Sequence, residues 1–135
     1  MNERIKKNLP RLFLRLALAA TLLSAVADRL GFWGANAAWG NWENFQKYTR
    51  QLTFFLPESL STISGYLATF LEIVFAILLL IGFKTRYAAA FTGLLLLIFA
   101  LSMSVSIGIK STLDYSVWVG SAAAILLAQQ EKQAG

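Results

Sequence analysis

The chain contains no cysteine and no histidine among its 135 residues. Without cysteine it has no disulfide, no thiol redox chemistry and no iron–sulfur cluster. Without histidine it lacks the commonest metal ligand, the usual haem ligand and the usual acid or base near neutral pH. Any redox role therefore needs a bound organic cofactor or a partner protein, and we predict no self-contained catalytic site and no metal site.

Charged residues are scarce as well. They make up 14% of the chain, whereas 57% is hydrophobic, and the mean hydropathy is +0.59. A soluble domain has about 25% charged and about 45–50% apolar residues. The composition therefore predicts an integral membrane protein embedded in the lipid bilayer, and the length predicts one domain over residues 1–135.

Four apolar segments are candidates for membrane spans, since about 20 apolar residues cross the hydrocarbon core. We predict an all-α fold, a four-transmembrane-helix bundle with spans at residues 12–30, 58–82, 87–107 and 115–129. Pro10 is expected in the first turn of the first helix, where its missing N–H costs nothing. In a second interpretation, the basic start and Ala25-Val26-Ala27 belong to a cleaved secretory signal. We expect the segment to be retained, because three later apolar segments need a first helix to pack against.

Residues 31–57, between the first and second spans, are the longest polar and aromatic stretch. Tryptophan and tyrosine favour the membrane–water interface, so we interpret this stretch as an interfacial segment over one end of the bundle. Apolar residues recur at helical spacing within it and predict a short amphipathic helix over residues 43–55. Those residues are Phe45, Tyr48, Leu52 and Phe55.

The basic residues predict the orientation. With four spans, eight of the 12 lysines and arginines share one side of the membrane: Arg4, Lys6, Lys7, Arg11, Arg15, Lys84, Arg86 and Lys132. Cytoplasmic loops are the ones enriched in lysine and arginine. We therefore predict the cytoplasmic inner membrane of a bacterium, with both termini cytoplasmic. The same rule accounts for the net charge of +5 without a nucleic-acid partner.

Glu72 is the most informative residue, because a charge at bilayer depth is costly and is kept for a reason. It lies on a stripe of small residues with Gly65, Thr69 and Ala76, so it should face the bundle. We predict a buried polar pair of Arg15 and Glu72. It is either a proton- or ligand-binding site or an ion pair that fixes helix packing. If Arg15 instead reaches the headgroups, Glu72 needs another partner or stays protonated.

Several of these residues carry a resemblance to a known family. Leu14-Arg15-Leu16, Glu72, the run Leu78–Phe83 before Lys84-Thr85-Arg86, and Ala88-Ala89-Ala90 together resemble the DoxX family. The resemblance implies four transmembrane helices. Family members are linked to oxidoreductase complexes, including a membrane subunit of thiosulfate:quinone oxidoreductase, and to oxidative-stress assemblies. Some carry histidine or cysteine near the outer end of the first helix, whereas this chain has residues 24–29, SAVADR, which speaks against thiol or metal chemistry.

A second candidate site is an outer cluster that the predicted topology gathers at one membrane face. Apolar walls, aromatic rings and a few charges are what a small-molecule pocket uses, and a quinone with Asp28 or Asp114 as proton acceptor fits this description. The alternative is an aromatic belt with Asp114 capping the fourth helix. The candidate residues are Asp28, Arg29, Trp33, Trp39, Trp42, Lys110, Ser111, Asp114, Tyr115 and Trp118.

Lys84 and Arg86 form a basic turn on the cytoplasmic side. They are topology signals, or they contact an anion, a lipid headgroup or a cytoplasmic partner.

Three functions remain open. The first is a small non-catalytic subunit of a membrane oxidoreductase that offers a quinone or hydrophobic-ligand site, with no protein-bound cofactor other than quinone. The second is a binding or transport protein for a lipid or small apolar solute, with Glu72 as coupling group. The third is a scaffold for soluble partners. The small-residue stripes also fit a homodimer, although internal packing explains them equally.

Overall fold

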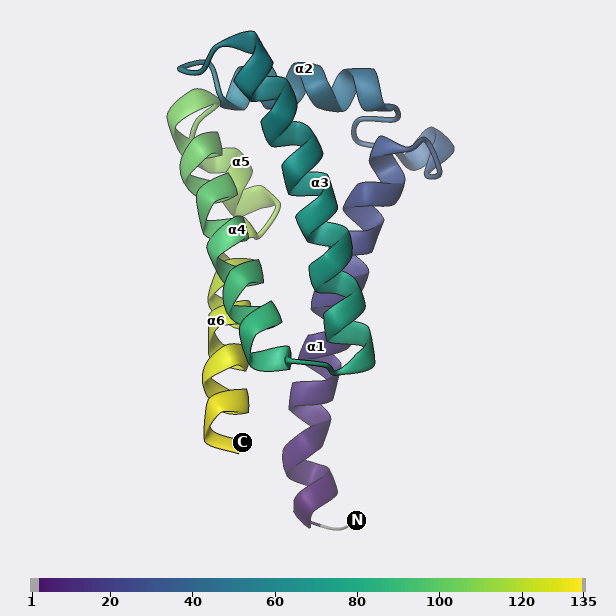
Figure 1. Cartoon of the computed structure of the whole chain (residues 1–135), viewed down its shortest axis with the longest axis vertical. Coiled ribbons are helices and arrows are strands. Elements are labelled where there is room, and N and C mark those ends of the chain that lie inside the picture. Colours follow the sequence, from purple (N-terminus) through teal and green to yellow (C-terminus); the bar gives the residue numbers. More distant parts are fainter. Residues whose placement is uncertain (1–2, 135) are drawn as a thin grey trace.

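The computed structural model describes residues 3–134, and this part of the chain is helical without a strand (Figure 1). The all-α prediction is therefore confirmed. The elements are α1 (Glu3–Arg29), the 3-10 turn η1 (Gly34–Asn36), α2 (Trp42–Leu52), α3 (Glu58–Ile81), α4 (Thr85–Ser106), α5 (Ile109–Asp114) and α6 (Val117–Ala134).

The four long helices α1, α3, α4 and α6 run alongside one another, and α2 lies across one end of them (Figure 1). Contacts link α1 to α3, α3 to α4, α4 to α6 and α6 back to α1. We call the end beneath α2 the covered end. The opposite end, which holds the α3–α4 turn with Lys84 and Arg86, we call the basic end.

Three of the described helices are long and apolar enough to cross a membrane: α1 from Lys6, α3 and α4. The prediction of four spans is not confirmed. The fourth predicted span begins at the junction of α5, which ends at Asp114, and α6, where Ser116 has a left-handed φ of 56°. The helix that follows, α6, begins at Val117 and ends in the polar sequence QQEKQA.

The first helix begins well before the predicted start. It runs from Glu3, so Pro10 lies inside the helix rather than in its first turn. Proline there removes the hydrogen bond to the carbonyl of Lys6, four residues earlier. The short polar N-terminal stretch is helical despite this, and it extends α1 past the α3–α4 turn at the basic end (Figure 1).

The α3–α4 turn has a physical cause in its residues. Gly82 takes the left-handed conformation, with φ +74°, that commonly ends a helix. Its N–H and that of Phe83 both donate to the carbonyl of Leu78, at 3.0 and 3.1 Å. Lys84, also left-handed, precedes the first residue of α4. Two long helices are thereby placed antiparallel with a short connection.

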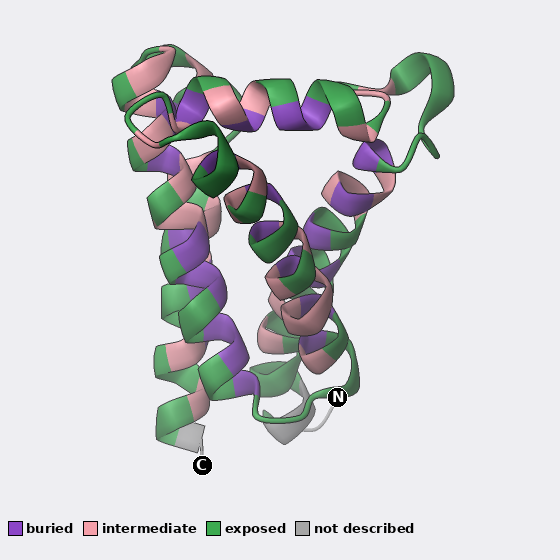
Figure 2. Ribbon diagram, turned by 45° about the horizontal axis from the view of Figure 1, so that its top comes forward, coloured by how far each residue is buried: buried purple, intermediate pink, exposed green. Residues whose placement is uncertain are grey.

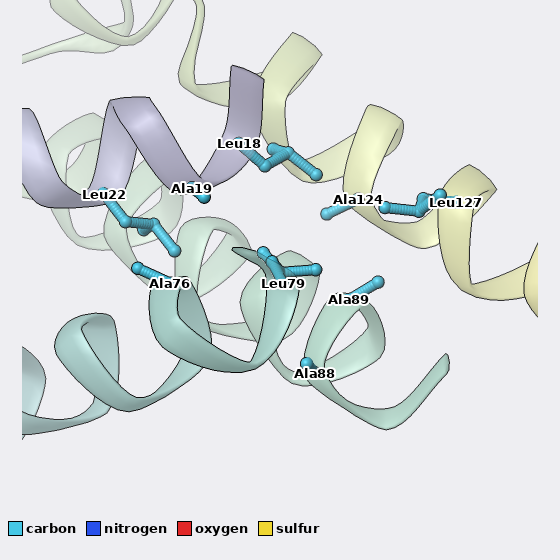
Figure 3. Packing of buried hydrophobic residues seen from close by; sticks show 9 residues of the cluster. All are labelled: Leu18, Ala19, Leu22, Ala76, Leu79, Ala88, Ala89, Ala124 and Leu127. Carbon is cyan, nitrogen blue, oxygen red and sulfur yellow. The ribbon is translucent and has the colours of Figure 1, made fainter. Parts of the chain in front are cut away.

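The apolar core lies in the half of the bundle nearer the basic end (Figure 3). Most of its members are alanine, and small side chains let helix backbones approach closely. Leucines from α1, α3 and α6 fill the remaining space. The buried members are Leu18, Ala19, Leu22, Ala76, Leu79, Ala88, Ala89, Ala124 and Leu127.

The closest helix pair is α4 with α6. The Ser121 hydroxyl donates to the carbonyl of Gly93 at 2.7 Å, across the two helices. A Cβ on Gly93 would stand 2.6 Å from Cγ1 of Ile125, so glycine is required at this crossing. The polar bond and the missing side chain therefore fix α6 against α4.

Buried residues follow the facing sides of the helices, and exposed residues cover their outer sides (Figure 2). Many exposed residues are large and apolar, among them Phe13, Phe70 and Val105, at 77, 63 and 69% exposure. Such a surface is unfavourable in water, whereas lipid tails cover it without cost. The outward faces thus agree with integration into a membrane.

Candidate functional site

The centre of the site is an ion pair between α1 and α3. Nη2 of Arg29 donates to Oε1 of Glu72 at 2.9 Å, and Nη1 stands 2.9 Å from Oε2. Nη1 also donates to the hydroxyl of Thr69 at 2.8 Å. Arg29 is 2% exposed and Glu72 is 1% exposed. The guanidinium therefore binds the carboxylate through both terminal nitrogens, and this bidentate geometry is the strongest for such a pair.

The small-residue stripe of α3 explains how Glu72 reaches this position. Gly65, Glu72 and Ala76 are all buried, so the stripe faces the bundle. The Thr69 hydroxyl donates to the carbonyl of Gly65 at 2.9 Å, which leaves its oxygen aimed at Arg29. The Glu72 carboxylate and the Thr69 hydroxyl oxygen thus both accept hydrogen bonds from Arg29.

The prediction that Arg15 pairs with Glu72 was wrong. Arg15 lies at the basic end instead, where a Cβ built on Gly82 would stand 3.0 Å from its Nη1. Gly82 is about 15 Å farther along the helix than Glu72, at about 1.5 Å per residue. The prediction placed Arg15 too deep because it began the first helix near residue 12, whereas α1 begins at Glu3.

Aromatic rings cover the ion pair. The guanidinium carbon of Arg29 lies 3.9 Å from the ring centre of Phe45 and 5.2 Å from that of Trp39. Trp42 packs against Phe45 at 5.2 Å and against Tyr66 of α3 at 4.9 Å. Rings facing a cation attract it, and they also exclude water from the pair.

Asp28, the neighbour of Arg29, binds the loop that precedes α2. Its carboxylate accepts backbone N–H groups from Ala38 at 2.7 Å, Trp39 at 2.9 Å and Gly40 at 2.9 Å. These bonds satisfy both carboxylate oxygens. Asp28 is therefore a positioning residue for the loop rather than the free proton acceptor that the sequence suggested.

The second half of the cover is α2 itself. The predicted amphipathic helix over residues 43–55 is present as Trp42–Leu52, and its buried face includes Phe45 and Leu52. Phe55, which the pattern assigned to the same face, lies beyond the helix and is 63% exposed. The Asn41 side chain caps the start of α2 by accepting from the N–H of Asn44.

Polar contacts close the far end of α2 against α3. The Thr53 and Ser61 hydroxyls are 2.6 Å apart, and Thr53 Oγ1 is also bonded to the carbonyl of Thr49 at 2.7 Å. Tyr48, on the same helix, packs against Trp39 with ring centres 5.7 Å apart. Burial, and to a lesser extent the neighbouring Tyr115, raises the pKa of the Tyr48 hydroxyl.

Three buried polar atoms in this region have no hydrogen-bond partner among the described residues: Arg29 Nε, Glu72 Oε2 and Gln46 Oε1. Oε2 keeps its ion-pair contact with Arg29. Gln46 packs on α3, where a Cβ built on Gly65 would stand 2.8 Å from its Oε1. Arg29 Nε from α1 and Gln46 Oε1 from α2, one donor and one acceptor, thus remain free beneath the cover.

The comparison with family models decides the relationship, because the DoxX model matches residues 11–105. This chain belongs to the DoxX family. No curated protein and no solved structure gave a significant match. The matched part of this DoxX-family chain includes the ion pair, its aromatic cover and the α3–α4 turn.

The remaining members of the predicted outer cluster do not join the ion pair. The Trp33 indole donates to the carbonyl of Ser24 at 3.0 Å and is 46% exposed. Trp118 donates to the Thr112 hydroxyl at 2.7 Å, beyond the part that matches the DoxX model. Asp114 is paired with Lys110 at 2.7 Å on the surface of α5.

Tyr115 and Ser111 complete that cluster. Tyr115 is 73% exposed. Ser111 belongs to α5, and its carbonyl accepts from the N–H of Tyr115, the residue that follows this helix. The proposed capping role of Asp114 also does not fit, because Asp114 is the last residue of α5 and its carboxylate is bonded to Lys110. Of the predicted outer cluster, the DoxX-family chain brings Asp28, Arg29, Trp39 and Trp42 to the ion pair and its cover.

The basic turn is exposed. Lys84 and Arg86 point their charges over Phe83 and Tyr87, with the cationic groups 5.8 and 5.4 Å from the ring centres. Neither forms an ion pair among the described residues. No group of three or more acidic residues that would hold a metal ion occurs in the part of the chain that the structure describes.

The sequence pointed to Arg29, Trp39 and Trp42 but missed Phe45, Gln46 and Thr69 as members of the site. Phe45 was assigned to the buried face of α2 without a role toward a cation. A signal was available for Thr69, because it shares the small-residue stripe with Glu72. Gln46 is adjacent to Phe45, and nothing in the pattern distinguished it.

Proposed function

We propose that this DoxX-family protein is a small non-catalytic membrane subunit of an oxidoreductase complex, and that it binds a quinone beneath α2. The observation that carries the proposal is the buried Arg29–Glu72 pair with an unused arginine donor under aromatic rings. We place it in a bacterial inner membrane with the basic end cytoplasmic, because lysine and arginine are enriched there.

The cost of the ion pair supports a role beyond packing. Two charges withdrawn from water rarely repay their desolvation by mutual attraction, and apolar residues of similar volume often stabilise a protein as well. Ionisable residues in transmembrane segments are rare and mark functional sites. The pair lies one helical turn beyond Ala76, at the edge of the apolar core that is nearer α2.

The free polar atoms match the chemistry of a quinone. The Nε–H of Arg29 is a donor for a quinone carbonyl, and Oε1 of Gln46 is an acceptor for a hydroxyl of the reduced form. Phe45, Trp39 and Trp42 supply aromatic surface for the ring. The chain itself has no cysteine or histidine, so the electrons come from a partner subunit.

The closed site implies that the cover moves when a ligand enters. Gln46 and the aromatic rings occupy the space over the pair, and the two hollows recorded on this structure lie at the basic end. The cover is held by hydrogen bonds to Asp28 and by the Thr53–Ser61 contact, which are exchangeable with water.

Quenching of tryptophan fluorescence by a short-chain ubiquinone tests the proposal, because Trp39 and Trp42 lie beside the site. Arg29→Lys keeps the charge but removes the Nε donor, and we expect binding about tenfold weaker or more. Gln46→Met removes the amide at similar volume and should also weaken binding. Circular dichroism confirms that each variant is folded.

Trp33→Phe is the matched control, because Trp33 is exposed and bonded to Ser24 away from the cover. It should leave the affinity unchanged. Wild-type affinity in both Arg29→Lys and Gln46→Met would remove the quinone site. Purification from native membranes without any redox subunit would remove the role in an oxidoreductase complex.

The transport function predicts that Glu72→Gln abolishes flux of an apolar solute into liposomes. Arg29 holds the Glu72 carboxylate on both oxygens, and this weighs against Glu72 as a freely titrating coupling group. Solute flux in wild-type liposomes that disappears in Glu72→Gln would favour transport over the quinone site.

A further inference from the structure

Arg15, which lies on α1 as Arg29 does, takes no part in the site above. Arg15 lies beside Gly82, at the C-terminal end of α3, where helix carbonyls favour a cation. Its Nε is buried and has no hydrogen-bond partner among the described residues. The guanidinium is only half-buried, so part of it remains accessible from outside the bundle.

Arg11 lies one turn before Arg15 on the same face of α1, since residues four apart are neighbours on a helix surface. It is bonded to Asn8, and its Nη1 is 3.9 Å from Glu131 of α6, a long contact for an ion pair. These groups line a hollow between α1 and α6. Its lining residues are Asn8, Leu9, Arg11, Leu12, Arg15 and Glu131.

An apolar hollow adjoins this polar one on α1. The two hollows share Leu9 and Leu12, so they lie next to each other on α1. Phe13 is 77% exposed, and Leu16 is 42% exposed. The apolar hollow is lined by Lys6, Leu9, Pro10, Leu12, Phe13 and Leu16.

We propose that this face of α1 binds an anionic phospholipid at the basic end, with the phosphate on Arg11 and Arg15 and an acyl chain along the apolar hollow. The charges are complementary, because two guanidinium groups outnumber the one carboxylate of Glu131. Arginine presents a planar fork that matches phosphate geometry. A phosphate in the hollow would accept from the terminal nitrogens of both guanidinium groups.

The apolar half of the surface selects a phospholipid over a free anion. A dissolved phosphate gains nothing from Leu9, Leu12 and Phe13, whereas an acyl chain covers them. Lys84 and Arg86 lie at the same end of the bundle and add to the attraction for anionic headgroups. The site is separate from the quinone site and does not depend on it.

Native mass spectrometry in detergent, with added phosphatidylglycerol or phosphatidylcholine, tests the proposal. We expect wild type to retain phosphatidylglycerol in preference to phosphatidylcholine. Arg11→Gln and Arg15→Gln should each weaken phosphatidylglycerol binding roughly fivefold. Arg50→Gln removes the same charge at the covered end, and it should bind as wild type does.

The apolar contribution has its own matched pair. Phe13→Ala should weaken phosphatidylglycerol binding, whereas Phe70→Ala, which removes another exposed ring, from α3, should not. Arg15→Lys is the variant to use if Arg15→Gln does not fold. It keeps the charge but lacks the planar fork, so it should bind phosphatidylglycerol more weakly than wild type.

Three results would overturn the proposal. Equal retention of phosphatidylcholine and phosphatidylglycerol would show that charge is not recognised. Equal loss in Arg50→Gln would show that only net charge matters. Thermal stabilisation by inorganic phosphate as large as that by phosphatidylglycerol would identify a free anion as the occupant.

Discussion

Arg29 and Arg15 are the same residue type on the same helix, yet the rest of the chain treats them differently. Arg29 is 2% exposed, and it contacts a carboxylate, a hydroxyl and two aromatic rings. Arg15 has a helix end and an unpartnered Nε. Both arginines keep an unpartnered Nε, but the terminal nitrogens of Arg29 bind a carboxylate and a hydroxyl within the chain, whereas those of Arg15 lie beside a helix end.

The difference follows from what each end of α3 offers. At the level of Arg29, Glu72 and Thr69 lie on the small-residue stripe of α3, and α2 covers the pair. At the level of Arg15, α3 has ended at Gly82, and only backbone carbonyls are near. Side chains of α3 therefore hold the terminal nitrogens of Arg29, whereas those of Arg15 stay available to groups outside the bundle.

The variant with the largest expected effect on this contrast is Glu72→Gln, which leaves Arg29 charged and buried without a counterion. We expect a loss of about 3–5 kcal/mol in the free energy of unfolding. Arg15→Gln is the control in phospholipid-free detergent, and it should cost less than about 1 kcal/mol. Denaturant unfolding followed by circular dichroism measures both.

A double variant sharpens the same contrast. Replacing both charges, Arg29→Met with Glu72→Leu, should restore much of the stability lost in Glu72→Gln, since an apolar pair needs no counterion. It should still lose quinone binding. The comparison between the two ends is wrong if Glu72→Gln is no more destabilising than Arg15→Gln.

The second test concerns the loop that Asp28 holds. Asp28→Asn keeps the shape but weakens three bonds from backbone N–H groups, and hydrogen bonds to a charged group contribute about 1.5–3 kcal/mol. We expect faster amide hydrogen exchange at Ala38, Trp39 and Gly40, with little change at the α3–α4 turn. Unchanged amide hydrogen exchange in the loop would contradict the role of Asp28 in holding it.

The smallest effects come from one glycine at each end. Gly82→Ala forces an alanine into a left-handed conformation, at a cost of about 1 kcal/mol in unfolding free energy. Gly65→Ala is helical and unstrained, but its Cβ would displace the Gln46 amide. We expect less than about 1 kcal/mol for Gly65→Ala, together with faster hydrogen exchange in α2, which Gly82→Ala should not cause.

The burial of Glu72 could be predicted, because small residues at helical spacing on α3 identify the face that packs inward. Its partner could not be predicted. The choice between Arg15 and Arg29 depends on where α1 begins relative to α3, and local composition does not fix that register. A polar N-terminal stretch became helical because the long apolar segment after it extends the same helix.

The amphipathic pattern predicted α2, but not that Phe45 would lie on a guanidinium. The role of Asp28 was hidden as well, because its partners are backbone N–H groups, which carry no residue identity. The fourth span was expected from its apolar residues, but α6 also contains the polar sequence QQEKQA and is not among the three helices that are long and apolar enough to cross a membrane.

The ion pair also constrains the order in which the protein is made. Arg29 leaves the ribosome 43 residues before Glu72, so the first helix enters the membrane with an arginine whose counterion does not yet exist. Until α3 arrives, Arg29 is best placed among headgroups at the surface. The final depth of α1 is therefore set late in biogenesis, when the second hydrophobic helix is inserted beside it.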